Sequence, residues 1–135
     1  MLRYRILFFA IALAAPQVKA EVIHGSSDIA KTATASELTE SQKVERLIEF
    51  IRSMKGATFI RNGSEHSCQE AAKHLKLKWE KHKGHISSAE EFIEDLASRS
   101  GLTGQDYLVR FADGTEKTTN EVLTKELRRL ESTKS

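Results

Sequence analysis

Apolar residues recur at helical spacing in four stretches of this chain. In the first stretch they return at steps of three and four residues, the period of one helix face. This face consists of Val44, Leu47, Ile48, Ile51 and Met54. Thr39 with Gln42 forms a capping-box pattern, in which each side chain satisfies a free backbone N–H group, and Gly56 supplies a stop. The pattern therefore predicts a helix from Thr39 onward.

The other three helices are predicted by the same combination of an apolar stripe and a capping box. Their inward positions are Cys68, Ala72, Leu75 and Trp79 in the second helix, Phe92, Ile93, Leu96 and Ala97 in the third, and Val122, Leu123, Leu127 and Leu130 in the fourth. Their capping boxes pair Ser67 with Glu70, Ser87 with Glu90, and Thr118 with Glu121. Gly84 and Gly101 are expected to end the second and third helices.

Two short hairpins are predicted between these helices. Each consists of a strand, a two-residue turn and a return strand: 58–61, Asn62-Gly63 and 64–66 in the first, and 107–111, Asp113-Gly114 and 115–117 in the second. Turn, return strand and capping box have the same spacing in both. Strand–turn–strand–helix units need this chemistry in general, and a pseudo-twofold repeat whose hairpins pair into one sheet would also produce it. The fold class is α+β, with about four helices and two short β-hairpins or a small antiparallel sheet.

The first twenty residues have the organisation of a secretory signal peptide. Arg3 and Arg5 precede an apolar run over residues 6–15, and Val18 and Ala20 stand before a cleavage point. The run is about half of the roughly 20 residues that a membrane-spanning helix needs. We therefore expect a signal peptide over 1–20, a flexible leader over 21–38 and one small globular domain over 39–132. The protein is then periplasmic or secreted, with no stable membrane span after cleavage.

Cleavage would change the charge of the chain. The full chain has 21 Lys and Arg against 19 Asp and Glu; three cations and no acid lie in residues 1–20, so the mature chain has 18 against 19, a net charge of −1. The composition therefore does not support nucleic acid as a partner. Cys68 is the single cysteine, so the domain has no internal disulfide. Its place on the stripe of Leu75 and Trp79 predicts a buried thiol.

Several segments together resemble a known protein family. They are FIRNGSEHSC at 59–68, EAAKHL at 70–75, AEEFI at 89–93, ASRS at 97–100 and GQDY at 104–107. This set resembles a family of small exported bacterial proteins whose function is unassigned. The resemblance covers roughly residues 40–130 and implies bacterial export and a single domain. It implies no catalytic residue, cofactor or substrate.

The first hairpin tip and two further segments hold the residues that we predict to face a ligand. These are Arg61, Asn62, Glu65, His66, His74, Ser98 and Ser100. Glu65 and His66 are neighbours on a strand and point to opposite faces, and Ser67 already caps a helix, so no catalytic residue is assigned. The spacing of the histidines and Cys68 matches no zinc signature, and we expect neither a metal nor a cofactor.

Two classes of function remain open. We expect an exported bacterial protein that is a non-enzymatic binding or accessory module of the cell envelope. The alternative is a small envelope hydrolase or transferase in which His66 acts with the hydroxyls of Ser98, Ser100 or Tyr107. The second helix carries five lysines: Lys73, Lys76, Lys78, Lys81 and Lys83. They could bind an anionic envelope partner or pair with the acidic third helix. The sequence pattern does not determine the oligomeric state.

Overall fold

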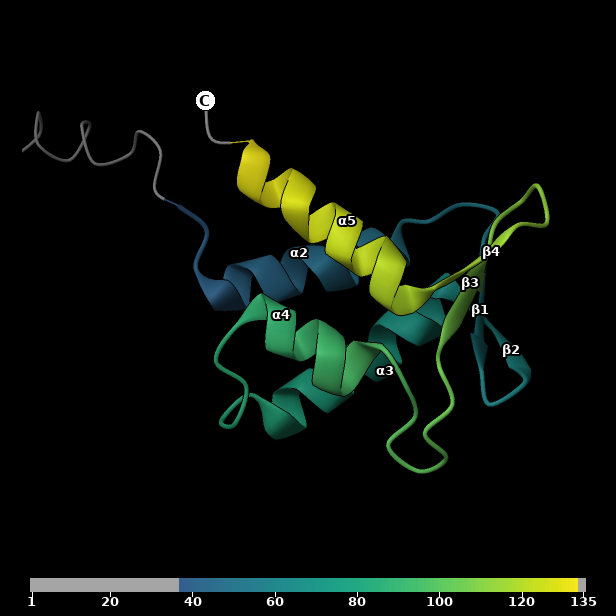
Figure 1. Ribbon diagram of the computed structural model, residues 1–135, viewed down its shortest axis with the longest axis horizontal. Helices are drawn as coiled ribbons and strands as arrows, with labels where there is room; N and C mark the ends of the chain where they lie inside the picture. The colour runs from purple at the N-terminus through teal and green to yellow at the C-terminus, as the bar shows by residue number, and fades with distance from the viewer. Residues whose placement is uncertain (1–36, 134–135) are drawn as a thin grey trace, which may run out of the picture. The chain divides into compact units, whose positions relative to one another are not determined.

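Two successive units of helix, strand, strand and helix build the domain. The structure, a computed structural model, describes residues 37–133; the predicted signal peptide and nearly all of the predicted leader lie outside these residues. The first unit contains α2 (Glu40–Arg52), β1 (Thr58–Arg61), β2 (Ser64–Ser67) and α3 (Cys68–His82). The second contains α4 (Ala89–Glu91) with the π-helix η1 (Phe92–Ala97), then β3 (Leu108–Arg110), β4 (Glu116–Thr118) and α5 (Thr119–Ser132). Figure 1 shows this order.

The two predicted hairpins pair into one antiparallel sheet with the order β2-β1-β3-β4. The central strands β1 and β3 join the units, with Phe59 opposite Val109. The predicted α+β class is therefore confirmed, and of the two arrangements left open the structure has the single small sheet. Both central residues are buried, which explains why this pairing forms: it removes two large apolar side chains from water.

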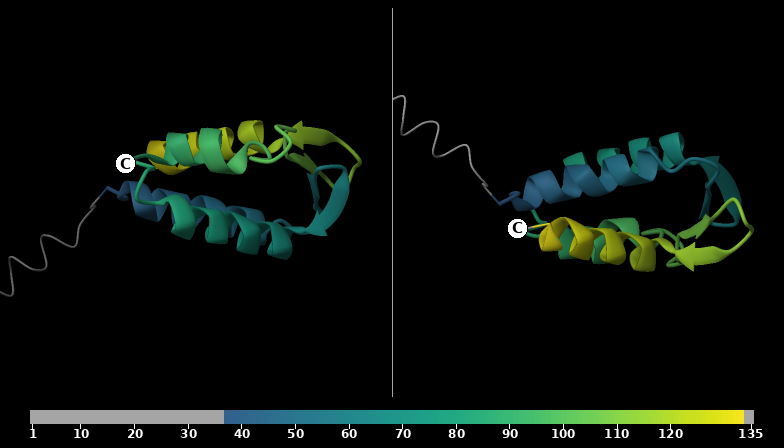
Figure 2. Two further views of the ribbon diagram at one scale, coloured as in Figure 1. Left: turned by 90° about the horizontal axis from the view of Figure 1, so that it is seen from below. Right: turned by 90° about the horizontal axis from the view of Figure 1, so that it is seen from above.

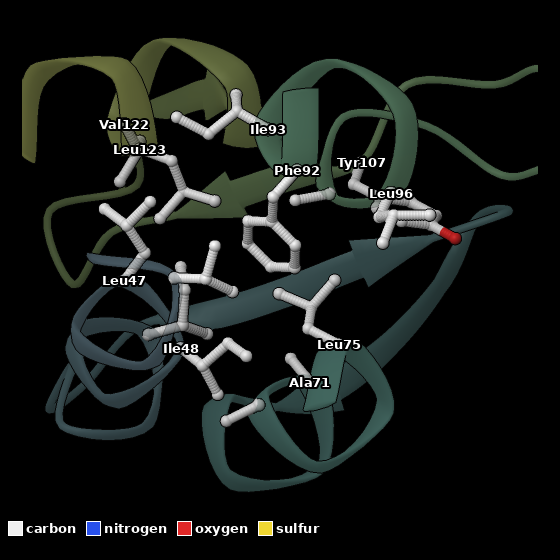
Figure 3. Packing of buried hydrophobic residues seen from close by; sticks show 14 of the residues in the cluster. Leu47, Ile48, Ala71, Leu75, Phe92, Ile93, Leu96, Tyr107, Val122 and Leu123 are labelled. Atoms are coloured by element: carbon white, nitrogen blue, oxygen red, sulfur yellow. The ribbon is translucent and has the colours of Figure 1, made fainter. Parts of the chain in front are cut away.

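The helices form two layers, and the sheet closes one end of them (Figure 2). The α2 and α3 helices of the first unit lie side by side, and so do η1 and α5 of the second. Apolar side chains from all four helical segments fill the space between the layers. Figure 3 shows the Phe92 ring between Leu47 and Ile48 of α2 and Leu75 of α3. Trp79 is 8% exposed and packs edge-on against Phe92, with ring centroids 6.0 Å apart. The predicted core positions of Trp79 and Cys68 are confirmed.

Three of the four predicted capping boxes are confirmed: Thr39 with Gln42, Ser67 with Glu70, and Thr118 with Glu121. The fourth, Ser87 with Glu90, is wrong by one residue. Ser88 caps α4, and the N–H and hydroxyl of Ser87 donate to the Glu91 carboxylate at 2.7 and 2.9 Å. A contact outside the local sequence favours this register, because the Ala89 N–H donates to Oε2 of Glu40 on α2 at 2.8 Å.

The third helix also differs from the predicted one, which was expected to run to Gly101. It changes from α to π geometry at Phe92 and ends at Ala97. The Ser98 hydroxyl donates to the Ile93 carbonyl at 2.5 Å, and the Ser98 carbonyl accepts from the Tyr107 N–H at 2.8 Å. These two bonds turn the chain into a loop that returns to the sheet, so the helix ends before its glycine.

Candidate functional site

Arg61 and His74 form the centre of a hollow in the first unit. Nη1 of Arg61, at the end of β1, lies 3.0 Å from Nδ1 of His74 in α3. A guanidinium can only donate, so Nδ1 accepts and the neutral imidazole carries its proton on Nε2. Around this pair lies a surface hollow of about 240 Å³, lined also by Phe59, His66, Lys73 and Leu77. We call it the Arg61 hollow.

The hairpin and the helix that follows it position these side chains. Asn62 and Gly63 both have positive φ, 51° and 76°, as a type I′ turn requires. This turn sets the register in which His66 lies opposite Phe59. The β2 strand continues into α3 through the Ser67 cap without an intervening loop. His66 and His74 therefore reach the same hollow from consecutive elements.

Lys78 and Tyr107 extend this cluster below the surface. Nζ of Lys78 donates to the Leu96 carbonyl at 2.6 Å and lies 3.5 Å from both the Arg99 carbonyl and the Tyr107 hydroxyl. The Tyr107 ring is 2% exposed and lies edge-on to His74. Its hydroxyl is at the margin of the apolar core (Figure 3). The carbonyl end of η1 thus holds a lysine ammonium that has no carboxylate beside it.

The charges in this cluster oppose one another. Burial first, and then the positive charges of Arg61, Lys78 and His66, lower the pKa of His74. Burial and Arg61 also lower the pKa of the Lys78 ammonium, and burial raises the pKa of the Tyr107 phenol. Within residues 37–133, neither Arg61 nor Lys78 makes an ion pair with a carboxylate.

Glu70, the acidic residue that lines the hollow, is already engaged in the capping box of α3. The Glu70 carboxylate accepts from the Ser67 N–H at 3.0 Å and from its hydroxyl at 3.1 Å, and the backbone bond is the main reason that its pKa is lowered. The arrangement is therefore suited to bind an anion, because half-buried cations without a counter-charge gain most from one.

The other predicted residues of the hairpin have different partners. The side-chain oxygen of Asn62 accepts from the Thr103 hydroxyl at 2.6 Å, which fastens the turn to the loop after η1. Glu65 pairs with Arg110, whose Nε also donates to Glu116 at 2.8 Å. Arg61 does not lie opposite Glu65 across the hairpin, where Ile60 is the facing residue. Neither Asn62 nor Glu65 lines the Arg61 hollow.

Ser98 and Ser100 are buried, with 2% and 5% of their surfaces exposed. The Ser98 hydroxyl donates to the Ile93 carbonyl and accepts from Nδ2 of Asn120 at 2.9 Å. The Ser100 hydroxyl accepts from the N–H groups of Leu102 and Thr103. Across residues 37–133, no hydrogen bond joins a histidine to a hydroxyl, so the described residues contain no preformed pair of a hydroxyl nucleophile and a histidine base.

The sequence pattern did not predict that Lys78 belongs to this cluster. The pattern distinguished it in no way from the other lysines of the second helix. Its spacing of four from His74 was an available signal, because residues four apart lie on the same helix face. The predicted pairing of these lysines with the acidic third helix is not seen in the described part of the chain, where Lys76 pairs with Glu80 of its own helix at 3.9 Å.

Residues 37–133 contain no group of three or more His, Cys, Asp or Glu side chains arranged to hold a metal ion. In the same range, no helix combines the length and apolar character that crossing a bilayer would require.

Comparison with known proteins identifies relatives of the described domain. The model of a family of unknown function, DUF5329, matches residues 38–131. An uncharacterised protein of Salmonella typhimurium, YfeK, is 38% identical over 68 residues, which are 50% of this chain and 57% of YfeK. The chain thus spans a little over half the length of this curated relative. No solved structure matches the chain.

Proposed function

The chain belongs to DUF5329, a family of unknown function, over residues 38–131, and from this premise we propose that it is an exported binding module. The Arg61 hollow holds an anionic group of a cell-envelope ligand. Arg61, His66 and Lys73 line the hollow and meet the ligand, while His74 orients Arg61 through the hydrogen bond at its Nδ1.

The absence of a counter-charge carries this proposal. Arg61 is half-buried, and the hydrogen bond to His74 is the one that its side chain makes within residues 37–133. A guanidinium has five N–H donors in a planar fork that matches carboxylate and phosphate oxygens. Most of these donors are left for a ligand. Lys78 raises the local positive potential further, although its ammonium is already held by the Leu96 carbonyl.

The same contacts favour binding over catalysis. His74 accepts from Arg61 through Nδ1, and its Nε2 is buried without a hydrogen-bond partner. A general base needs a lone pair within reach of the group that it deprotonates, and neither nitrogen of His74 offers one. The hydroxyls of Ser98 and Ser100 are bonded inside the domain. Because these two hydroxyls are already bonded, they weigh against the hydrolase or transferase alternative, in which His66 would act with them.

The pattern of residues 1–20 supports export to the periplasm or beyond. It predicts that the mature chain begins at Glu21. Mass spectrometry of the protein from bacteria that express the full-length chain should show the loss of twenty residues. An intact Met1 in the exported fraction would contradict cleavage.

Binding can be tested with two simple anions and the exported product of the full-length chain. Inorganic phosphate and acetate, titrated separately and followed by NMR of the histidine rings, distinguish a phosphate from a carboxylate ligand. We expect saturable shifts of His66 and His74 with one of them, and about tenfold weaker binding in Arg61→Gln, which corresponds to about 1.4 kcal/mol.

The matched control removes one charge from the same helix outside the hollow. Lys81 is exposed and does not line the hollow, so Lys81→Gln should bind as the wild type does. Equal weakening by both substitutions would mean unspecific attraction to a basic surface. Failure of both anions to saturate the histidine shifts would contradict the proposed site.

A further inference from the structure

The second unit carries a hollow at the position equivalent to the Arg61 hollow. Its volume is about 550 Å³, and it lies beside β4 and α5. Three lining residues of one hollow correspond to three of the other at a constant separation of 51 positions: His66 to Lys117, His74 to Lys125 and Leu77 to Arg128. Each unit therefore has a hollow at the same place in its strand–helix geometry, and the two hollows differ in the side chains that line them. We call it the α5 groove.

The floor of the α5 groove is apolar. Phe50 comes from the last turn of α2 and Met54 from just beyond that helix, Phe111 follows β3, and Val122 comes from the first turn of α5. The first three are half-buried side chains that pack against the core but keep one side toward the groove. Isolated exposed apolar residues are ordinary on protein surfaces, whereas several that converge in one concavity indicate a ligand site.

The rim of the α5 groove is basic. Lys117, Lys125, Arg128 and Arg129 line it together with two acids. Both acids are engaged: Glu126 is 7% exposed and accepts from Arg129 at 2.6 and 2.8 Å, and Glu121 accepts from the Thr118 cap.

Three of the four cations of the rim are left without an ion pair. In the described part of the chain, none of Lys117, Lys125 and Arg128 approaches a carboxylate within ion-pair distance. Lys125 and Arg128 are the chain neighbours of Glu126 and Arg129, the two residues that pair with each other in α5, and both line the edge of the apolar concavity. This combination calls for a ligand that is apolar along its length and negative at one end.

We propose that the α5 groove binds a single-chain anionic amphiphile of the fatty-acid class. The alkyl chain lies on Phe50, Met54 and Phe111, and the carboxylate meets Lys125 and Arg128. The volume is within the roughly 300–1,000 Å³ of small-molecule sites. A stable interface with a protein partner would bury about 800 Å² of the surface of this domain, which is much more than three half-buried side chains provide.

The test uses the exported product of the full-length chain and dodecanoate below its micelle concentration. Displacement of the fluorescent fatty acid cis-parinarate reports binding, and circular dichroism verifies that the protein stays folded. We expect saturable displacement by dodecanoate and at least about tenfold weaker displacement by octanoate, because four fewer methylenes are buried. Dodecanol, which has the chain without the charge, should bind at least several-fold more weakly than dodecanoate.

Paired substitutions distinguish the effect of the rim cations on binding from the effect of the net charge of the domain. Lys125→Gln combined with Arg128→Gln should weaken dodecanoate about tenfold or more and leave dodecanol unchanged. Lys81→Gln combined with Lys83→Gln removes the same charge from exposed positions at the C-terminal end of α3 and should change neither. Met54→Gln, a change of similar shape in the floor, should weaken both ligands. Arg61→Gln should leave dodecanoate binding intact, so that failure of this inference and failure of the Arg61 hollow are distinguishable.

Three outcomes would overturn the assignment. One is the absence of saturable parinarate binding. Another is equal weakening of dodecanoate by the rim pair and the α3 pair of substitutions. The third is binding to vesicles of anionic lipid with no binding of monomeric dodecanoate, which would assign the surface to a membrane instead.

Discussion

Lys78 donates from Nζ to the backbone carbonyl of Leu96 at 2.6 Å, across the boundary between the two αββα units. The carbonyl belongs to the last turn of the π-helix, where no amide of the same helix is available to it. A half-buried lysine of α3 thus satisfies a helix end of the opposite unit. This contact also brings the ammonium beside the Tyr107 hydroxyl.

We predict that Lys78→Met lowers the free energy of unfolding by about 1–3 kcal/mol, because the Leu96 carbonyl loses its charged donor. Urea denaturation followed by Trp79 fluorescence measures the change. Lys76→Met is the matched control: Lys76 is exposed and its 3.9 Å pair with Glu80 is worth at most about 1 kcal/mol. Equal stability of the Lys78 and Lys76 variants would show that the carbonyl contact contributes nothing.

His74 should make stability dependent on pH. Its pKa lies below the ordinary 6.5, chiefly through burial and then through Arg61, Lys78 and His66. The unfolded chain therefore binds a proton at His74 where the folded domain does not. The stabilisation is complete above about pH 6.5 and is lost as the pH falls from there toward the folded pKa.

Unfolding free energies at pH 7.5 and 5.5 measure this dependence. The loss between the two should be smaller in His74→Gln, whose amide can still accept from Arg61. His82→Gln should keep the wild-type loss, since His82 lies outside the cluster. An unchanged pH dependence in the His74 variant would contradict the prediction.

Gly63→Ala should destabilise the domain by about 1 kcal/mol. Gly63 has φ +76°, and a Cβ there would meet no atom within 4 Å, so the penalty arises from backbone strain alone. Gly101→Ala also meets nothing within 4 Å but has no positive φ, and we expect its stability to be unchanged or slightly higher. Thermal denaturation of both variants compares them. A Gly63 variant as stable as the Gly101 variant would be inconsistent with the type I′ turn.

Trp79→Ala should lower the free energy of unfolding by about 3–5 kcal/mol, as truncation of a large aromatic in a core does. The indole is 8% exposed and lies edge-on to Phe92. Denaturation followed by circular dichroism is the appropriate measurement, because the substitution removes the tryptophan fluorescence. Leu77→Ala, at a side chain 58% exposed on the same helix, should change stability by less than about 0.5 kcal/mol. A loss below about 1 kcal/mol for Trp79 would exclude a core role.

Cys68 should react slowly with thiol reagents in the native protein. Its surface is 2% exposed, its Sγ lies 3.4 Å from the Ala57 carbonyl, and burial raises the pKa of the thiol. The reacting species is the thiolate, so both burial and the raised pKa slow the reaction. The comparison is Cys68→Ala combined with Lys81→Cys, whose exposed thiol should react at nearly the rate of an unfolded chain. Similar rates for both proteins would contradict the burial of Cys68.

Three capping boxes and the first hairpin turn could be predicted without the structure. The boxes of Thr39, Ser67 and Thr118 each lie within four residues of the chain, and so does the Asn62-Gly63 turn. Such features depend on φ, ψ and hydrogen bonds between near neighbours, which the sequence states directly. The same applies to the stripes that placed Cys68 and Trp79 in the core.

The candidate site could be predicted only in part, because only some of its residues are near neighbours in the chain. Arg61, His66 and His74 come from one hairpin and the helix that follows it, so proximity along the chain already suggested that they meet. Ser98 and Ser100 come from the other unit, and nothing local indicated that their hydroxyls would be bonded within the domain. The α5 groove could not be predicted from the sequence, because its floor combines Phe50 with Phe111, sixty-one positions apart.

The sequence by itself determined which segments are helices and strands, where most of them begin, and which side chains are buried, since these follow from periodicity and short-range hydrogen bonds. Only the tertiary structure decided that β1 pairs with β3, that α4 starts after Ser88, and that Lys78 binds the end of η1. Each of these depends on contacts between residues far apart in the chain, where burial and hydrogen-bond satisfaction of the whole domain select one arrangement among several that are locally acceptable.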